Sequence, residues 1–236
     1  MRAVPAALFL FLLAGLALAE APQPFSASYT LTANGVRAAE SSRTLQRRED
    51  GVWEFRTVAQ PAGVATLFVR DRIEEYSRWR LEEGKVKPMS YAYHQTGGRR
   101  ERHREIAFDY ERGVIASTLT DERWDLPCCA QDLASIQIAL MLDVAQGKTQ
   151  MEYPIADGRR VESYTFEVKG EGRVETPAGR YHTVRVEQRD TDRQRSMIFW
   201  LAPELGYLPV RIEQRDAERT VGTLVLRLTR LRGDPG

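Results

Sequence analysis

Two adjacent cysteines, Cys128 and Cys129, are the side chains whose type and spacing first suggest specialised chemistry. In an oxidising compartment an even number of cysteines is compatible with a disulfide. A bridge between sequence neighbours closes a strained eight-membered ring, and strained disulfides are easily reduced. The sequence therefore leaves open a vicinal disulfide, a pair of partly buried thiols near the start of a helix, an intermolecular bridge and a metal contact.

The motifs of the common enzyme classes are absent. The three histidines, His94, His103 and His182, form no HxH or HExxH pattern and have no cysteine at zinc-binding spacing. There is no GxSxG, SxxK, GxGxxG or Walker loop. Acidic residues are plentiful, so a catalytic carboxylate pair remains open, but no pair stands out. We therefore expect no catalytic residue, no metal and no cofactor.

Aromatic and apolar side chains are the remaining candidates for a site. Tyr91 and Tyr93 lie on one face of an expected strand, and Trp124 shortly precedes the cysteines. Such residues usually fill the core of a β protein, and a lined cavity is the sharper alternative. The candidate cavity lining is Tyr91, Tyr93, Phe108, Trp124, Ile136, Leu140 and Met141.

Hairpins must position these residues, because apolar residues alternate with polar ones between turn dipeptides. Phe25, Ala27 and Tyr29 share one strand face, and Asn34-Gly35 follows as a strong hairpin signal. Similar turns recur at Glu83-Gly84, Gly97-Gly98, Asp157-Gly158 and Pro177-Ala178-Gly179. The pattern predicts a mainly β fold, a curved antiparallel sheet forming an open or partial barrel or a sandwich of successive hairpins.

One segment, at about 132–146, is predicted to be a buried helix. Asp132 can cap its first turn, and Gly147 suits the position just past its end. The predicted apolar stripe is Leu133, Ile136, Leu140, Met141 and Val144, extended by Ile138 and Leu142. Because the apolar surface exceeds one stripe, we expect the helix to lie across or inside the curved sheet.

Residues 1–19 have the features of a cleavable secretory signal. An apolar run ends in Ala17-Leu18-Ala19, the small-x-small pattern that precedes cleavage. We expect cleavage after Ala19, leaving 20–236 as a single β-rich domain in the periplasm. No later stretch is long and apolar enough to predict a transmembrane segment, and no cysteine directly follows the signal to carry a lipid anchor.

Charge is nearly balanced, with 34 Lys and Arg against 33 Asp and Glu, so no electrostatic footprint for nucleic acid is expected.

Three stretches together resemble the bacterial domain-of-unknown-function family 3108. They are Gln131–Ser135, Glu175–Tyr181 and Trp200–Glu213, and the resemblance runs from about Phe25 to about Leu231. It implies an exported protein and a fold, and it supplies no catalytic residues; the cysteine pair is not part of the pattern. More distantly, the expected fold is similar to periplasmic carriers of the LolA and LolB type, which are unclosed barrels with helices over an apolar cavity.

Three functions remain open at this point. The first is a non-catalytic binding protein for an apolar or lipid-like small molecule in the cell envelope. The second is a structural or assembly factor of the envelope that contacts a partner protein. The third is a hydrolase of envelope polymers. The first is favoured because amphipathic strands surround one helix that is too apolar for a surface position.

Overall fold

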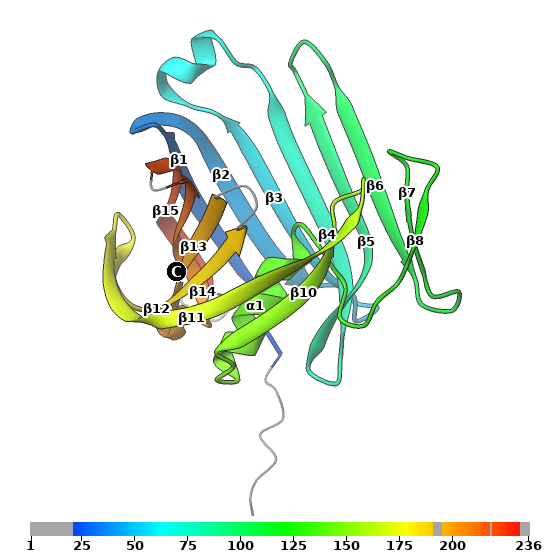
Figure 1. Ribbon diagram of the computed structural model, residues 1–236. Coiled ribbons are helices and arrows are strands. Elements are labelled where there is room, and N and C mark those ends of the chain that lie inside the picture. Colours follow the sequence, from blue (N-terminus) through cyan, green and yellow to red (C-terminus); the bar gives the residue numbers. More distant parts are fainter. Residues whose placement is uncertain (1–20, 191–194, 218, 232–236) are drawn as a thin grey trace, which may run out of the picture.

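The computed structural model describes residues 21–190, 195–217 and 219–231 (Figure 1). The predicted signal, residues 1–19, lies outside the described residues.

The described residues form one curved sheet of 15 strands that is not closed into a barrel, with one α-helix against its concave side (Figure 1). The strand order is β8-β7-β6-β5-β4-β3-β2-β1-β15-β14-β13-β12-β11-β10-β9. β9 and β10 pair in parallel, and the other neighbouring pairs that the described residues form are antiparallel. This confirms the predicted fold class. The strands are β1 (Phe25–Ala33), β2 (Val36–Arg47), β3 (Trp53–Pro61), β4 (Arg72–Glu82), β5 (Lys85–Thr96), β6 (Arg102–Asp109), β7 (Val114–Ser117), β8 (Arg123–Asp125), β9 (Gln131–Asp132), β10 (Gln150–Ala156), β11 (Val161–Thr176), β12 (Gly179–Asp190), β13 (Arg195–Ala202), β14 (Leu208–Asp216) and β15 (Arg219–Leu231). The helix is α1 (Ser135–Ala145), and two 3-10 turns are η1 (Gly63–Leu67) and η2 (Pro203–Leu205).

The turns form where the dipeptides predicted them. Asn34 and Gly35 have φ angles of 49° and 80°, the left-handed pair that a two-residue hairpin needs. The turn places Phe25, Ala27 and Tyr29 on the buried face of β1, as their alternation predicted. Pairing of β1 with β15 then brings the first and last strands together in the middle of the sheet.

Helix α1 begins later than predicted, at Ser135 rather than Asp132, because Asp132 belongs to the short strand β9. The Asp132 carboxylate still serves the helix start, since its Oδ1 accepts hydrogen bonds from the amides of Ala134 and Ser135 at 2.8 and 2.7 Å. Ile138, Leu140 and Met141 are buried, as expected. Leu133 is not: it precedes the helix and its side chain is 44% exposed, which corrects its place in the predicted stripe.

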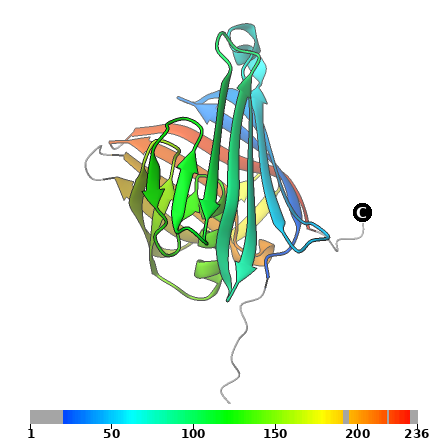
Figure 2. The same ribbon diagram turned by 90° about the vertical axis from the view of Figure 1, so that its right-hand side faces the viewer.

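The sheet has two halves, β1–β8 and β9–β15, whose outer ends approach each other. Side-chain contacts between these ends form a seam. The turn at Asp157 and Gly158 lies against β6 and β7, where Arg104 donates to the Asp157 carbonyl and Ser117 Oγ donates to the Gly158 carbonyl at 2.9 Å. Figure 2 shows the β5–β8 side of the sheet, which this seam joins to the β10–β11 turn. Side chains therefore connect the halves where no strand ladder does.

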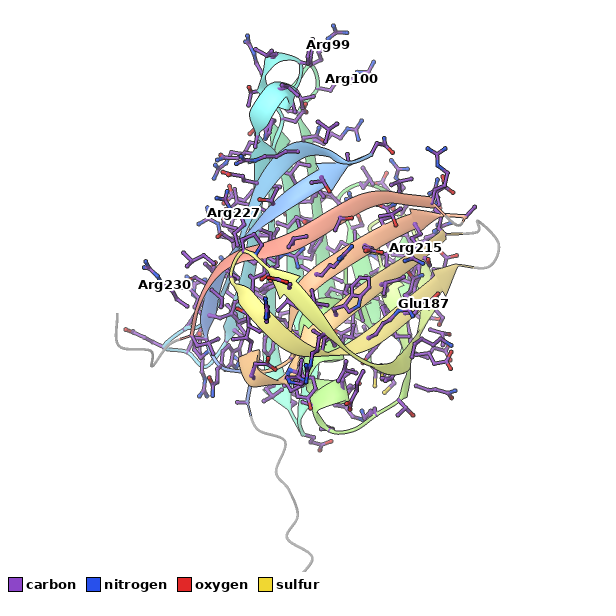
Figure 3. All side chains as sticks on the ribbon, turned by 90° about the vertical axis from the view of Figure 1, so that its left-hand side faces the viewer. Arg99, Arg100, Glu187, Arg215, Arg227 and Arg230 are labelled. Atoms are coloured by element: carbon purple, nitrogen blue, oxygen red, sulfur yellow. The ribbon has the colours of Figure 1, made fainter. Side chains whose placement is uncertain are left out.

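An apolar tip stands at the far end of β3 and β4, above the rest of the molecule (Figures 1 and 2). It consists of Val64, Leu67, Phe68 and Val69, of which Leu67 and Phe68 are 77% and 85% exposed. The adjoining β5–β6 turn carries Arg99 and Arg100 at the same end of the molecule (Figure 3). This arrangement leaves large apolar side chains in solvent beside cationic ones.

Candidate functional site

An apolar cavity of about 480 Å³ lies between α1 and the concave face of the sheet. Its volume falls within the range of about 300–1000 Å³ that is typical of small-molecule pockets. Strands from both halves of the sheet contribute residues to its wall, so the cavity forms only when the two halves are folded around α1. The lining is Leu31, Ser41, Arg43, Ala59, Leu133, Ile136, Gln137, Leu140, Ile155, Tyr164, Phe166, Gln188, Met197, Phe199, Ile212, Gln214, Gly222 and Leu224.

Strand alternation places one arginine in this lining, whose other described residues are uncharged. Ser41, Arg43 and Leu45 share the inner face of β2, with exposed Ser42 and Thr44 between them. The Arg43 guanidinium lies 4.9 Å above the Tyr29 ring and donates to Gln137 Oε1 on α1. These contacts hold the guanidinium at the wall of the cavity.

The surroundings of Arg43 are weakly solvated. Burial lowers the pKa of Arg43 from its ordinary value, while the nearby Tyr29 and Glu75 act in the opposite direction. Burial also raises the pKa of Tyr29 to about 12, against the effect of Arg43. Tyr29 is neutral at physiological pH and donates from its hydroxyl to the Pro209 carbonyl at 3.0 Å. It therefore supplies an aromatic face and no counter-charge.

Asp132 anchors the start of α1 from beneath. Its Oδ2 accepts a hydrogen bond from Ser77 Oγ at 2.7 Å, and its own amide donates to Ser135 Oγ at 2.9 Å. Complete burial raises the pKa of Asp132 to about 6, because desolvation outweighs the hydrogen bonds from Ser77, Ser135 and Ala134. With its oxygens already engaged, this carboxylate positions the helix that bears Ile136, Gln137 and Leu140.

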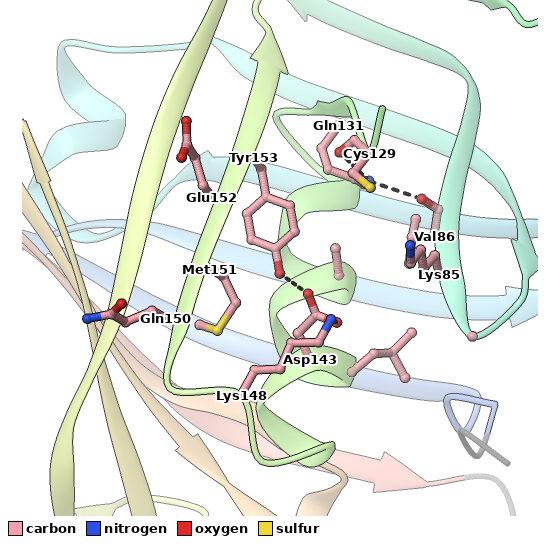
Figure 4. A pocket seen from close by; sticks show the side chains of 13 residues that line it. Lys85, Val86, Cys129, Gln131, Asp143, Lys148, Gln150, Met151, Glu152 and Tyr153 are labelled. Atoms are coloured by element: carbon pink, nitrogen blue, oxygen red, sulfur yellow. Dashed lines mark hydrogen bonds and ion pairs between the residues drawn. The ribbon is translucent and has the colours of Figure 1, made fainter. Parts of the chain in front are cut away.

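A smaller pocket of about 240 Å³, with both charged and apolar side chains in its lining, lies on the other side of α1, against β10 (Figure 4). There the Tyr153 hydroxyl donates to Asp143 Oδ2 at 2.5 Å, and Lys148 pairs with Asp143 Oδ1 at 2.6 Å. Burial and the Asp143 carboxylate raise the pKa of Tyr153. Tyr153 therefore keeps its proton, and Asp143 is already paired with Lys148. This arrangement favours a structural role for the hydrogen bond between α1 and β10 over a role in proton transfer.

Cys128 and Cys129 are free and exposed, with their Sγ atoms 2.9 Å apart. Cys129 has a left-handed φ of 66° and lines the smaller pocket. Burial and the neighbouring Cys128 raise the pKa of the Cys129 thiol, which lowers the fraction of reactive thiolate at neutral pH.

The apolar cavity takes in two of the seven candidate lining residues, Ile136 and Leu140. Met141 is buried on α1 outside this lining. The other four lie on β5, β6 and β8, where Tyr91 and Phe108 are buried and Tyr93 and Trp124 pack against the same core. The Tyr91 hydroxyl donates to Glu75 Oε1 at 2.5 Å, and Tyr93 donates to Gln95 Oε1 at 3.1 Å.

Sequence reasoning missed Arg43 and Gln137. Arg43 lies among polar residues on β2 and resembles a solvated strand position. The available signal was its spacing, two residues before buried Leu45 on the same face. Gln137 lies between two apolar helix residues, Ile136 and Ile138, and a single polar residue in such a run gives no sequence signal of a binding role.

Among the described residues, no group of three or more His, Cys, Asp or Glu side chains could hold a metal ion. His94 and His103 face each other across β5 and β6, with ring centroids 5.0 Å apart. Within the same described ranges, no helix has both the length and the apolar character needed to cross a bilayer.

The curved, unclosed sheet places the molecule in a class of β-barrel-like proteins. A β-barrel-like protein of domain of unknown function DUF1849 from Brucella abortus has a similar structure, with a TM-score of 0.57 at 12% identity. That match covers 90% of this chain and 99% of the other, and it is a likeness of fold alone. MucB is also similar, at a TM-score of 0.38 and 12% identity over 91% of this chain and 55% of MucB.

The chain belongs to the family described as Protein of unknown function (DUF3108), whose model matches residues 28–229. This confirms the family that the sequence motifs predicted. No curated protein matches the chain.

Proposed function

We propose that this protein binds an apolar or lipid-like small molecule in the cavity between α1 and the sheet. The observation that carries the proposal is the composition of that cavity. Leu31, Ile136, Leu140, Phe166 and other apolar side chains line about 480 Å³ of space, which a packed β core would fill.

Direct binding of a neutral fluorescent probe tests this function. The purified protein is titrated with N-phenyl-1-naphthylamine, and a saturable rise in emission is expected. Ala59→Phe should reduce probe affinity at least tenfold, because Ala59 lines the cavity and a phenyl ring there takes up part of the space that the probe needs. Val58→Phe is the matched control, because the neighbouring position is absent from the cavity lining. No saturable binding, or equal effects of the two variants, would contradict the proposal.

The apolar tip favours a second candidate, an envelope assembly factor that contacts a partner protein. Leu67 and Phe68 are almost fully exposed, and large apolar side chains in solvent are typical of interaction sites. A photo-crosslinking amino acid at position 67 should yield one discrete protein adduct in living cells. Glu49 is the control position, in the turn at the opposite end of β3. Similar adducts from both positions would eliminate this candidate.

Export to the periplasm after removal of residues 1–19 is also part of the proposal. The apolar run and the Ala17-Leu18-Ala19 site support it. N-terminal sequencing of the protein from a periplasmic extract should begin at Glu20, with no lipid attached. A chain that retains Met1, or that remains with the cytoplasmic fraction, would contradict it.

A further inference from the structure

Among the described residues that line the apolar cavity, Arg43 is the single charged one. Within the described part of the chain, no carboxylate lies within ion-pair distance of its guanidinium. Its Nε is buried without a hydrogen-bond partner, and so is Nε2 of Gln137, whose side chain is 9% exposed and also lines the cavity. Two unsatisfied donors of neighbouring residues therefore lie at the wall of an apolar space.

The one carboxylate that acts on Arg43, among the described residues, is engaged elsewhere. Glu75 acts on Arg43 at longer range, and its Oε1 accepts the hydroxyl of Tyr91. Arg43 is partly buried and its Nε is fully so. A guanidinium largely withdrawn from water and without a carboxylate is costly, so its place in an apolar wall favours a counter-ion from outside the chain.

We propose that the cavity takes an alkyl-chain amphiphile with a carboxylate head group, such as a long-chain fatty acid. The carboxylate pairs with the Arg43 guanidinium and accepts a hydrogen bond from the Gln137 amide. A planar carboxylate matches the guanidinium fork, and one cation in the lining matches a head group with one negative charge. Ile136, Leu140, Phe166 and the other apolar side chains cover the hydrocarbon chain.

This inference rests on the proposed function, and a matched pair of ligands separates the two. Dodecanoate and dodecan-1-ol have equal chain lengths and differ in head charge at pH 8. Each is titrated against the protein loaded with N-phenyl-1-naphthylamine. We expect dodecanoate to displace the probe at a concentration at least tenfold lower than the alcohol.

Variants of Arg43 assign the preference to its charge. Arg43→Met should abolish the preference for dodecanoate while the alcohol still displaces the probe. Arg43→Lys should keep part of the preference, because it retains the charge and loses the fork. Arg47→Met is the matched control: Arg47 lies on the same strand, 6.0 Å from the Trp53 ring, and outside the cavity lining. It should leave the preference unchanged.

Each outcome has a distinct meaning. Equal displacement by both ligands from the unmodified protein would overturn the carboxylate inference and leave the proposed function standing. A preference that survives in folded Arg43→Met would overturn it as well. Failure of the probe to bind the unmodified protein would refute the proposed function itself. If Arg43→Met does not fold, the ligand pair on the unmodified protein and on Arg43→Lys still decides the question.

Discussion

Asp132 illustrates how one buried residue links the sheet to the helix. Its carboxylate joins Ser77 on β4 to the first amides of α1, and no solvent reaches it. Hydrogen bonds favour the ionised form of this group, yet desolvation is the larger effect and raises its pKa to about 6.

The raised pKa of Asp132 predicts a pH-dependent stability. Between about pH 4 and pH 6 the unfolded chain ionises this carboxyl group while the folded chain holds it protonated, so stability falls as pH rises. The difference between the ordinary pKa of an aspartate and a value of about 6 corresponds to about 3 kcal/mol in the free energy of unfolding. The difference between the unmodified protein and Asp132→Asn should change by up to this amount between pH 3.5 and pH 7. Urea unfolding at several pH values measures it, and parallel curves for the two proteins would contradict the prediction.

At the scale of single elements, α1 owes its position to burial on several sides. Ile138 is fully buried, whereas Leu133 is 44% exposed just before the helix. Ile138→Ala should therefore lower the free energy of unfolding by about 3 kcal/mol, through lost burial and the void left behind. Leu133→Ala should cost less than about 1 kcal/mol. Chemical denaturation of both variants checks the contrast, which similar losses would refute.

The β1–β2 hairpin depends on a backbone conformation that glycine adopts at little cost. Gly35 has a φ of 80°, and a Cβ there would meet no atom within 4 Å. Gly35→Ala should thus destabilise the protein by about 1 kcal/mol for conformational reasons alone. Gly172, on β11, does not have a left-handed φ, and a Cβ there would make an ordinary contact with Thr183. Gly172→Ala should be neutral or slightly stabilising, and thermal unfolding of the pair tests the difference in sign.

The sequence predicts local elements well because their signals are local. Alternation of Phe25, Ala27 and Tyr29 indicated the inner face of β1, and the apolar run around Ile138 indicated a buried helix. The cavity is harder to predict, since its lining comes from strands that are distant in sequence, such as β2 and β14. Arg43 and Gln137 are 94 residues apart in the sequence and come together only in the folded chain. The residues around each of them therefore give no indication of this contact.

At the scale of the whole molecule, the seam at Asp157 and Gly158 joins the two halves of the sheet. Arg104 lies 5.0 Å from the Tyr93 ring while it donates to the Asp157 carbonyl. Arg104→Met should loosen this seam, so that the amides of residues 157–160 exchange faster with deuterium while those of α1 keep their protection. Arg102→Met, an exposed position on the same strand, is the control. Unchanged exchange at the seam would show that Arg104 does not hold it.

The pairing of β1 with β15 has a consequence for how the chain folds. Residues 25–33 find their second neighbour only among residues 222–231, so the middle of the sheet is completed when the last strand has been synthesised. Until then the chain can hold two stacks of hairpins, β1–β8 and β10–β14, each with an unpaired inner edge. Contacts of such high sequence separation slow folding. A late final step leaves the inner edges of β1 and β14 unpaired for longer, and an unpaired strand edge can pair with another chain.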